Sequence, residues 1–208
     1  MRYLLILSCL LATSIHAKGI GNFSATPDEL RRLPGYCGPK AHSKGNDLSR
    51  PDVKYWSDRL GADVYLHIHH YCHALVQIQH YLESMRKQSG LINAAQRNLD
   101  YSIDQTPEEH PILLDLLLSK SYLFELSFDF EAAEALALQV QQVDPKRVQV
   151  YVQLSRIYWI DKQPDRALSI LSRGISATDS KILKQRHENF KAKVAAYQDT
   201  TTSHTQEP

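Results

Sequence analysis

PILLDLLLSKSYLFELSFDFEAAEALALQVQQVDP occupies residues 111–145, and VQVYVQLSRIYWIDKQPDRALSILSRGISATDS occupies residues 148–180. When the second segment is shifted by 34 residues, small and large apolar side chains coincide at five positions. Such a period indicates a repeated helical hairpin, because stacked repeats of one unit leave this signature in a sequence. The matched pairs are Leu117/Tyr151, Ser121/Ser155, Phe124/Tyr158, Ala133/Ala167 and Ala137/Leu171.

The residue types at these positions have a steric explanation. Two helices can cross closely only where their side chains are small, and a large side chain then fills the space beside the crossing. In each copy the small residues come late in the first helix and early in the second, with an aromatic residue one turn after the first small one. The predicted packing positions are Ser121, Phe124, Ala133, Ser155, Tyr158 and Ala167.

This pattern resembles the tetratricopeptide repeat (TPR) family. Pro145 lies where the family closes a repeat, although Asp179 replaces proline in the second copy. Upstream, WSDRLGADVY at 56–65 is similar to the family's opening, and Ala95 and Pro107 keep its spacing of twelve residues. The resemblance implies a stack of helical hairpins in which the first helix of each hairpin lines a concave groove that binds a protein or peptide.

Apolar residues recur at helical spacing from Tyr55 onward, with almost no strand signal. We therefore predict an all-α, TPR-like stack of about three helical hairpins plus a C-terminal capping helix in DSKILKQRHENFKAKVAAY. The predicted parts are a signal peptide (1–17), an irregular N-terminal arm (18–54), the repeat domain (55–198) and a disordered tail (199–208). The predicted helices span 62–85, 90–104, 108–126, 130–142, 147–160, 164–177 and 180–198.

The N-terminus, MRYLLILSCLLATSIHA, is typical of a secretory signal peptide. Arg2 precedes a short apolar run, and the small residue Ala17 follows at the expected cleavage site. The run is too short to span a bilayer, and no later stretch is apolar enough to do so. We expect an exported protein, periplasmic or secreted, without an integral membrane segment.

Cleavage near Ala17 removes Cys9 and leaves Cys37 and Cys72. In an oxidising compartment, an even number of cysteines favours a disulfide, so we predict that these two are bonded. A free, nucleophilic Cys72 beside a histidine is the alternative.

The arm between residues 18 and 54 carries one short helical signal. TPDELRRL offers Thr26 as an N-cap, Pro27 at the first helical position and Glu29 three residues after the cap. PGYCGPK then breaks the helix. If the disulfide forms, it fastens this arm to the body of the protein at Cys37.

YLHIHHYCHAL at 65–75 is the most unusual stretch, with His80 close behind. On a helix, His69, His73 and His80 fall within about 40° of one another, away from the main apolar face. We predict a polar and aromatic stripe of Tyr65, His69, His73 and His80, which either lines a partner-binding groove or is covered by the arm. The helix itself is predicted to be the docking site of the arm.

Metal binding is the alternative hypothesis for the histidines, and it is the more specific of the two. His69 and His73 are four residues apart, so their imidazoles could hold one copper or zinc ion. His80 lies about 10 Å further along the helix, too far to complete that site. The missing ligands would have to come from the arm, for example from His42, or from another helix.

Composition narrows the function classes. Without Arg2 the chain has 23 basic and 23 acidic residues, and no basic tract stands out, which argues against a nucleic-acid partner. The sequence contains no glycine-rich phosphate loop, no GxSxG motif and no regular paired-carboxylate motif. We therefore expect no enzyme and no cofactor, but an exported TPR-like adaptor or scaffold for a protein or peptide in a bacterial envelope assembly. The alternative function is histidine-dependent metal binding on the same scaffold.

Overall fold

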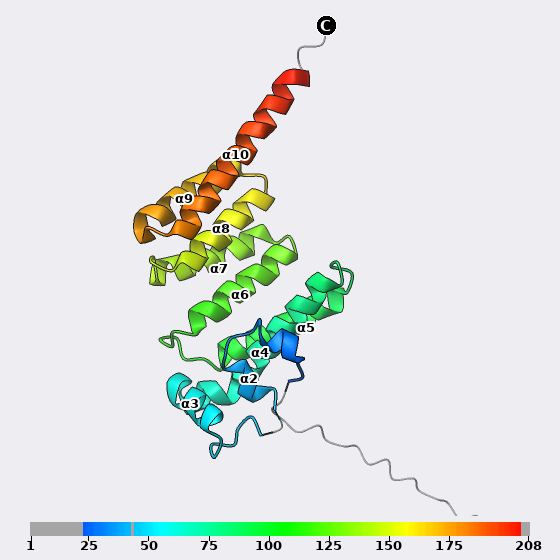
Figure 1. The fold of residues 1–208 in the computed structure, drawn as a ribbon, viewed down its shortest axis with the longest axis vertical. Helices are drawn as coiled ribbons and strands as arrows, with labels where there is room; N and C mark the ends of the chain where they lie inside the picture. Colours follow the sequence, from blue (N-terminus) through cyan, green and yellow to red (C-terminus); the bar gives the residue numbers. More distant parts are fainter. Residues whose placement is uncertain (1–22, 43, 205–208) are drawn as a thin grey trace, which may run out of the picture.

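The computed structural model describes residues 23–42 and 44–204, with side chains described as far as Ala196. Within these residues the chain forms ten helices and no strand, which confirms the predicted all-α class (Figure 1). The predicted signal peptide lies outside the described residues. The helices are α1 (Pro27–Leu30), α2 (Cys37–Lys40), α3 (Pro51–Leu60), α4 (Ala62–Glu83), α5 (Ser89–Asp104), α6 (Leu113–Leu126), α7 (Phe130–Val143), α8 (Val148–Ile160), α9 (Pro164–Thr178) and α10 (Lys181–His204).

Six helices form three hairpins. Helix α4 packs against α5, α6 against α7 and α8 against α9, and the hairpins follow one another along the long axis of the molecule (Figure 1). Helix α10 packs on the last hairpin, against both α9 and α8. The described chain therefore has the appearance of a helical repeat array with an additional C-terminal helix.

The turns of the second and third hairpins repeat each other at the same 34-residue spacing. Phe128 and Lys162 both adopt a left-handed backbone conformation, with φ of 62° and 58°. The amide after Phe128 donates to the carbonyl of Phe124 at 2.9 Å, and the amide after Lys162 donates to that of Tyr158 at 2.8 Å. These bonds satisfy carbonyls at the helix C-terminus, so the two turns share one C-capping geometry.

The small residues of the repeat are fully buried. Ala133 and Ala167 have no exposed surface, and neither do Ser121 and Ser155. The Ser121 hydroxyl donates to the Ala133 carbonyl at 2.7 Å, which places the two residues across the contact between α6 and α7. Ser155 differs, because its hydroxyl donates to Val152 within its own helix, at 2.9 Å.

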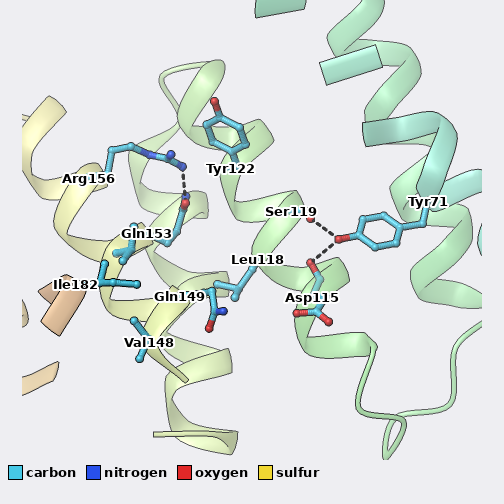
Figure 2. A pocket seen from close by; sticks show the side chains of 11 residues that line it. Tyr71, Asp115, Leu118, Ser119, Tyr122, Val148, Gln149, Gln153, Arg156 and Ile182 are labelled. Atoms are coloured by element: carbon cyan, nitrogen blue, oxygen red, sulfur yellow. Dashed lines mark hydrogen bonds between the residues drawn. The ribbon is translucent and has the colours of Figure 1, made fainter. Parts of the chain in front are cut away.

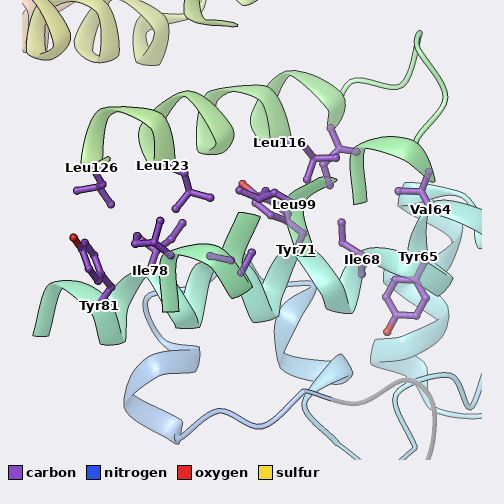
Figure 3. Packing of buried hydrophobic residues seen from close by; sticks show 14 of the residues in the cluster. Val64, Tyr65, Ile68, Tyr71, Ile78, Tyr81, Leu99, Leu116, Leu123 and Leu126 are labelled. Carbon is purple, nitrogen blue, oxygen red and sulfur yellow. The ribbon is translucent and has the colours of Figure 1, made fainter. Parts of the chain in front are cut away.

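Two hydrophobic cores lie end to end in the stack. The first joins α3, α4, α5 and α6, and in Figure 3 the leucines of α6, such as Leu116 and Leu123, face Ile68 and Ile78 of α4. The second core joins α6 to α10 around Leu154 and Leu171, both fully buried. Helix α6 contributes to both cores and so links the first hairpin to the other two.

The structure differs from the prediction by more than two residues at three places. The helix expected at 108–126 begins at Leu113, because Pro111 disfavours helical geometry in the residue before it. Helices α2 and α3 both begin within the segment 18–54, which was expected to be irregular apart from one short helix. Helix α10 runs to His204, although the repeat domain was expected to end at residue 198.

The short helix that was predicted in the arm begins at the expected N-cap. The Thr26 side chain accepts from the Glu29 amide, and the Glu29 carboxylate accepts from the Thr26 amide, so α1 opens with a capping box. Among the described helices, none is both long and apolar enough to cross a membrane.

Candidate functional site: a groove along alternate helices

A groove of about 400 Å³ runs across one face of the stack. Its walls come from α4, α6, α8 and α10, which are the first helices of the three hairpins and the C-terminal helix (Figure 2). An apolar strip of four side chains crosses it, and this strip is defined as Leu118, Val148, Val152 and Ile182. Ile182 is 65% exposed and is the most exposed member of the strip.

The residues of the groove obey the 34-residue register. Leu118 of α6 and Val152 of α8 are 34 positions apart, and so are Val148 of α8 and Ile182 of α10. Two surface positions of the repeat are therefore each presented twice along the array. This register is the signal in the sequence that could have identified the groove, because it extends into α10.

One end of the groove is closed by Tyr71. Its hydroxyl lies 2.9 Å from Ser119 Oγ and donates to the Asp115 carbonyl at 3.4 Å (Figure 2). Burial raises the pKa of Tyr71 to about 12, so its hydroxyl stays protonated and can donate. The Asp115 carboxylate forms an ion pair with Arg147 at 2.5 Å, which leaves little free charge at this end.

A polar network occupies the other end. The Arg156 guanidinium contacts the buried Glu125 carboxylate at 2.7 Å and stacks 4.2 Å above the ring of Tyr122. Gln153 donates to the same carboxylate at 3.1 Å and to Ser121 Oγ at 3.2 Å. Burial raises the pKa of Glu125, and Arg156 and Gln153 oppose that shift by contacting the charged carboxylate.

Arg186 of α10 lies beside this network. Its Nε donates to Ser155 Oγ at 2.9 Å, and its guanidinium lies 4.9 Å from the centre of the Phe190 ring. Burial lowers the pKa of Arg186, and the neighbouring Arg156 lowers it further. Sequence reasoning did not select Arg156 or Arg186.

The predicted stripe on α4 lies beneath the arm at both of its ends. Tyr65 is buried, its hydroxyl donates to the Gly45 carbonyl at 3.1 Å, and Lys40 Nζ lies 4.0 Å above its ring. At the far end, His80 Nε2 contacts the Glu29 carboxylate. Both residues therefore hold the N-terminal arm in place.

His69 and His73 lie between these contacts and are partly buried. His69 Nδ1 lies 3.1 Å from the Leu66 carbonyl, and His73 Nε2 lies 3.4 Å from Gln77 Nε2. Burial, with a contribution from His70, lowers the pKa of His69 to about 4. A partner-binding role for Tyr65, His69, His73 and His80 stays a prediction, but the groove described above lies on another face of α4, at Tyr71.

The arm is anchored along its length. A disulfide joins Cys37 to Cys72, and both cysteines are fully buried. Around it, Phe23 and Leu33 of the arm form a small core with Val76 of α4. The blue segment in Figure 1 accordingly lies against α4, in the docking position that the sequence predicted.

The arrangement of the histidines bears on the metal hypothesis. Nowhere in residues 23–42 and 44–204 do three His, Cys, Asp or Glu side chains converge in a geometry that could hold a metal ion. The His69 and His73 pair has no third ligand in this part of the chain.

Comparison of the chain with protein-family models, curated proteins and solved structures finds no match. Function is consequently inferred from the contacts, burial and charge of this chain itself.

Proposed function

We propose that this protein is a non-enzymatic, exported, TPR-like adaptor that binds a segment of a protein partner in the groove between Tyr71 and Arg156. The observation that carries the proposal is the register of the groove. Residues 34 positions apart on alternate helices present apolar side chains to one surface, and a partly exposed apolar strip bounded by polar groups is typical of an interaction site.

The charged groups of the groove suit binding rather than catalysis. Asp115 is paired with Arg147, and Glu125 with Arg156, so both carboxylates are held in ion pairs. A general acid or base needs a carboxylate that is free to exchange a proton with a substrate. These pairs instead shape the two ends of the groove and fix the side chains between them.

Export is supported by two independent features. The first 17 residues have the charge and apolar pattern of a signal peptide. The buried disulfide between Cys37 and Cys72 fits an oxidising compartment such as the periplasm, because cytosolic thiols are kept reduced. We infer that the adaptor works in an assembly of the bacterial envelope.

The test compares two exposed apolar residues. Ile182 in the groove is 65% exposed and Val143 at the end of α7, outside the groove, is 67% exposed, so Ile182→Asp and Val143→Asp should both stay folded. Each variant is produced in the native cell, crosslinked and captured, and the bound proteins are quantified by mass spectrometry. We expect at least one partner whose recovery falls about tenfold with Ile182→Asp and is unchanged with Val143→Asp. Equal recovery of every partner with both variants would contradict the proposal.

A further inference from the structure

Arg186 has an unusual electrostatic environment. Arg186 is partly buried, yet no carboxylate of the described chain lies within ion-pair distance of its guanidinium. Its Nε is used by Ser155, and one face of the guanidinium lies over Phe190. A desolvated guanidinium without an acidic partner is unfavourable, so a bound carboxylate at this position would be stabilised.

The surroundings of Arg186 carry an excess of positive charge. Arg156 lowers the pKa of Arg186 and Glu125 raises it, but the Glu125 carboxylate is already engaged by Arg156 and Gln153. Arg86, in the turn between α4 and α5, also acts electrostatically on Glu125. Arg156 is therefore in direct contact with this carboxylate, while Arg86 and Arg186 act on it only at longer range.

The position of Arg186 on α10 follows from the repeat register. Leu118, Val152 and Arg186 are successive members of one 34-residue series, and Ile182 precedes Arg186 by one helical turn. Arg186, which does not itself line the groove, thus lies one helical turn from the end of the apolar strip at Ile182. Because the Asp115–Arg147 ion pair occupies the opposite end, the excess positive charge is confined to the end near Arg156.

We infer that the groove recognises an acidic peptide segment in which apolar residues flank an Asp or Glu. The apolar side chains contact Leu118, Val152 and Ile182, and the carboxylate pairs with Arg186 beside Arg156. Apolar contact supplies most of the affinity, while the charge pair fixes orientation and excludes basic segments. This inference rests on the proposed function, since it specifies the chemistry of the partner that the groove binds.

A random-peptide phage library, selected on the full exported chain with its disulfide intact, supplies the probes. The enriched peptides are synthesised, and their dissociation constants are measured by fluorescence polarisation. We expect Asp or Glu next to Leu, Ile or Val in the enriched sequences. We also expect Arg186→Gln to weaken their binding about tenfold, and added salt to weaken binding to the wild type more than to this variant.

The matched control is Lys191→Gln, which removes the same charge from an exposed position on the same helix and should leave binding unchanged. Arg156 is left intact because its removal would leave the buried Glu125 carboxylate without its ion-pair partner. Arg186→Lys retains the charge without the planar guanidinium and should recover part of the affinity.

The outcomes separate the inference from the proposed function. If the peptides lose binding with Ile182→Asp but show no acidic preference and tolerate Arg186→Gln, the acidic partner is wrong and the groove function stands. If the selection yields no peptide that Ile182→Asp weakens, both are wrong. Equal losses with Arg186→Gln and Lys191→Gln would show a general charge effect and would also overturn the inference.

Discussion

Tyr151 of α8 and Gly174 of α9 lie at a helix contact where the sizes of the residues differ between the two copies of the repeat. In the register of 34 residues they correspond to Leu117 and Val140, so the second copy has a larger residue on one helix and a smaller one on the other. A Cβ atom added at Gly174 would lie 2.5 Å from Tyr151 Cγ and 2.8 Å from a methyl carbon of Leu183. Gly174 is therefore required by the close approach of α8, α9 and α10.

Because Gly174 and Tyr151 are in contact, substitutions at the two positions should have non-additive effects on the free energy of unfolding. Gly174→Ala should overpack the contact and lower the free energy of unfolding by about 1–3 kcal/mol, despite the better helix propensity of alanine. Adding Tyr151→Ala should recover part of that loss, because alanine lacks the Cγ and Cδ1 atoms that the new methyl group would meet. Urea unfolding of the wild type, the two single variants and the double variant gives the coupling energy. Strictly additive effects would show that the two residues are not in contact.

A second prediction at this scale concerns His69. Its pKa is lowered to about 4 from an ordinary value of 6.5, mainly by burial, so the folded state binds fewer protons than the unfolded state between these values. The contribution of His69 to stability is therefore present above pH 6.5 and is lost as the pH falls toward 4. Stability measured by urea unfolding should fall over this range, and less steeply for His69→Gln. An unchanged slope would contradict the burial of His69, and His187→Gln on distant α10 serves as the control.

Helical geometry predicted which side chains of α4 face the core and which form the histidine line. It separated Ile68 and Cys72, which are buried, from the line of His69, His73 and His80. It could not predict that Glu29 meets His80 or that Gly45 meets Tyr65, because these contacts join segments distant in sequence and leave no periodic signal. The docking of the arm on this helix was predictable from the two cysteines alone.

At the scale of elements, the arm is the part whose stability depends most on a covalent bond. Helices α1 and α2 are single turns that could not persist alone in water. The disulfide between Cys37 and Cys72 closes a separation of 35 residues, for which loop-closure entropy corresponds to about 4 kcal/mol. The capping box and the small core around Phe23 then hold the arm against α4.

Loss of the disulfide should therefore release the arm before it unfolds the stack. We expect Cys37→Ser with Cys72→Ser to increase amide hydrogen exchange in residues 26–42 strongly, with much smaller changes in α6 to α9. The first measurement is mass spectrometry of unreduced digests of the exported protein, which should show the two cysteine-containing peptides linked. Two free thiols in that sample, or uniform exchange changes throughout the chain, would contradict this description.

The crossing between the helices of each hairpin gives another prediction. Ala133→Leu and Ala167→Leu insert bulk at fully buried positions and should each cost about 1–3 kcal/mol. Ala135→Leu adds the same bulk at an exposed position of α7 and should change stability little. Thermal unfolding of the three variants is the measurement. Melting temperatures unchanged at both buried sites would refute the 34-residue register.

Most elements were predictable because amphipathic periodicity determines where a helix lies. The expected helices at 130–142, 147–160 and 164–177 each agree with the observed ones to within one residue at either end. The helix expected at 108–126 ran past Pro111, which disfavours helical geometry in the residue before it. The turn there is also held by a bond between the His110 ring and the Leu60 carbonyl at 3.0 Å, which leaves no periodic signal. Helix α3 was missed since its first residues read as part of an irregular arm.

For the molecule as a whole, alternate helices of the hairpins share a surface that the sequence did not locate. The expected binding stripe was placed on the histidine line of α4, whereas the groove follows Tyr71 and the first helices of the later hairpins. Which face of a helix is left open depends on what covers the other faces, and the arm covers one of them. The all-α class and the order of the hairpins, by contrast, follow from local patterns.

The central claim is that this groove, and not the face of α4 near the arm, contacts the partner. The most direct test is site-specific photo-crosslinking in the native cell. A benzophenone amino acid replaces Leu118 or Ile182 in the groove, and in separate variants it replaces Leu66 near the arm or Val143 at the end of α7, all with the fold checked by circular dichroism. We predict that one and the same partner is crosslinked from both groove positions and from neither of the others. Crosslinks to that partner from Leu66, with none from Leu118 and Ile182, would contradict the account.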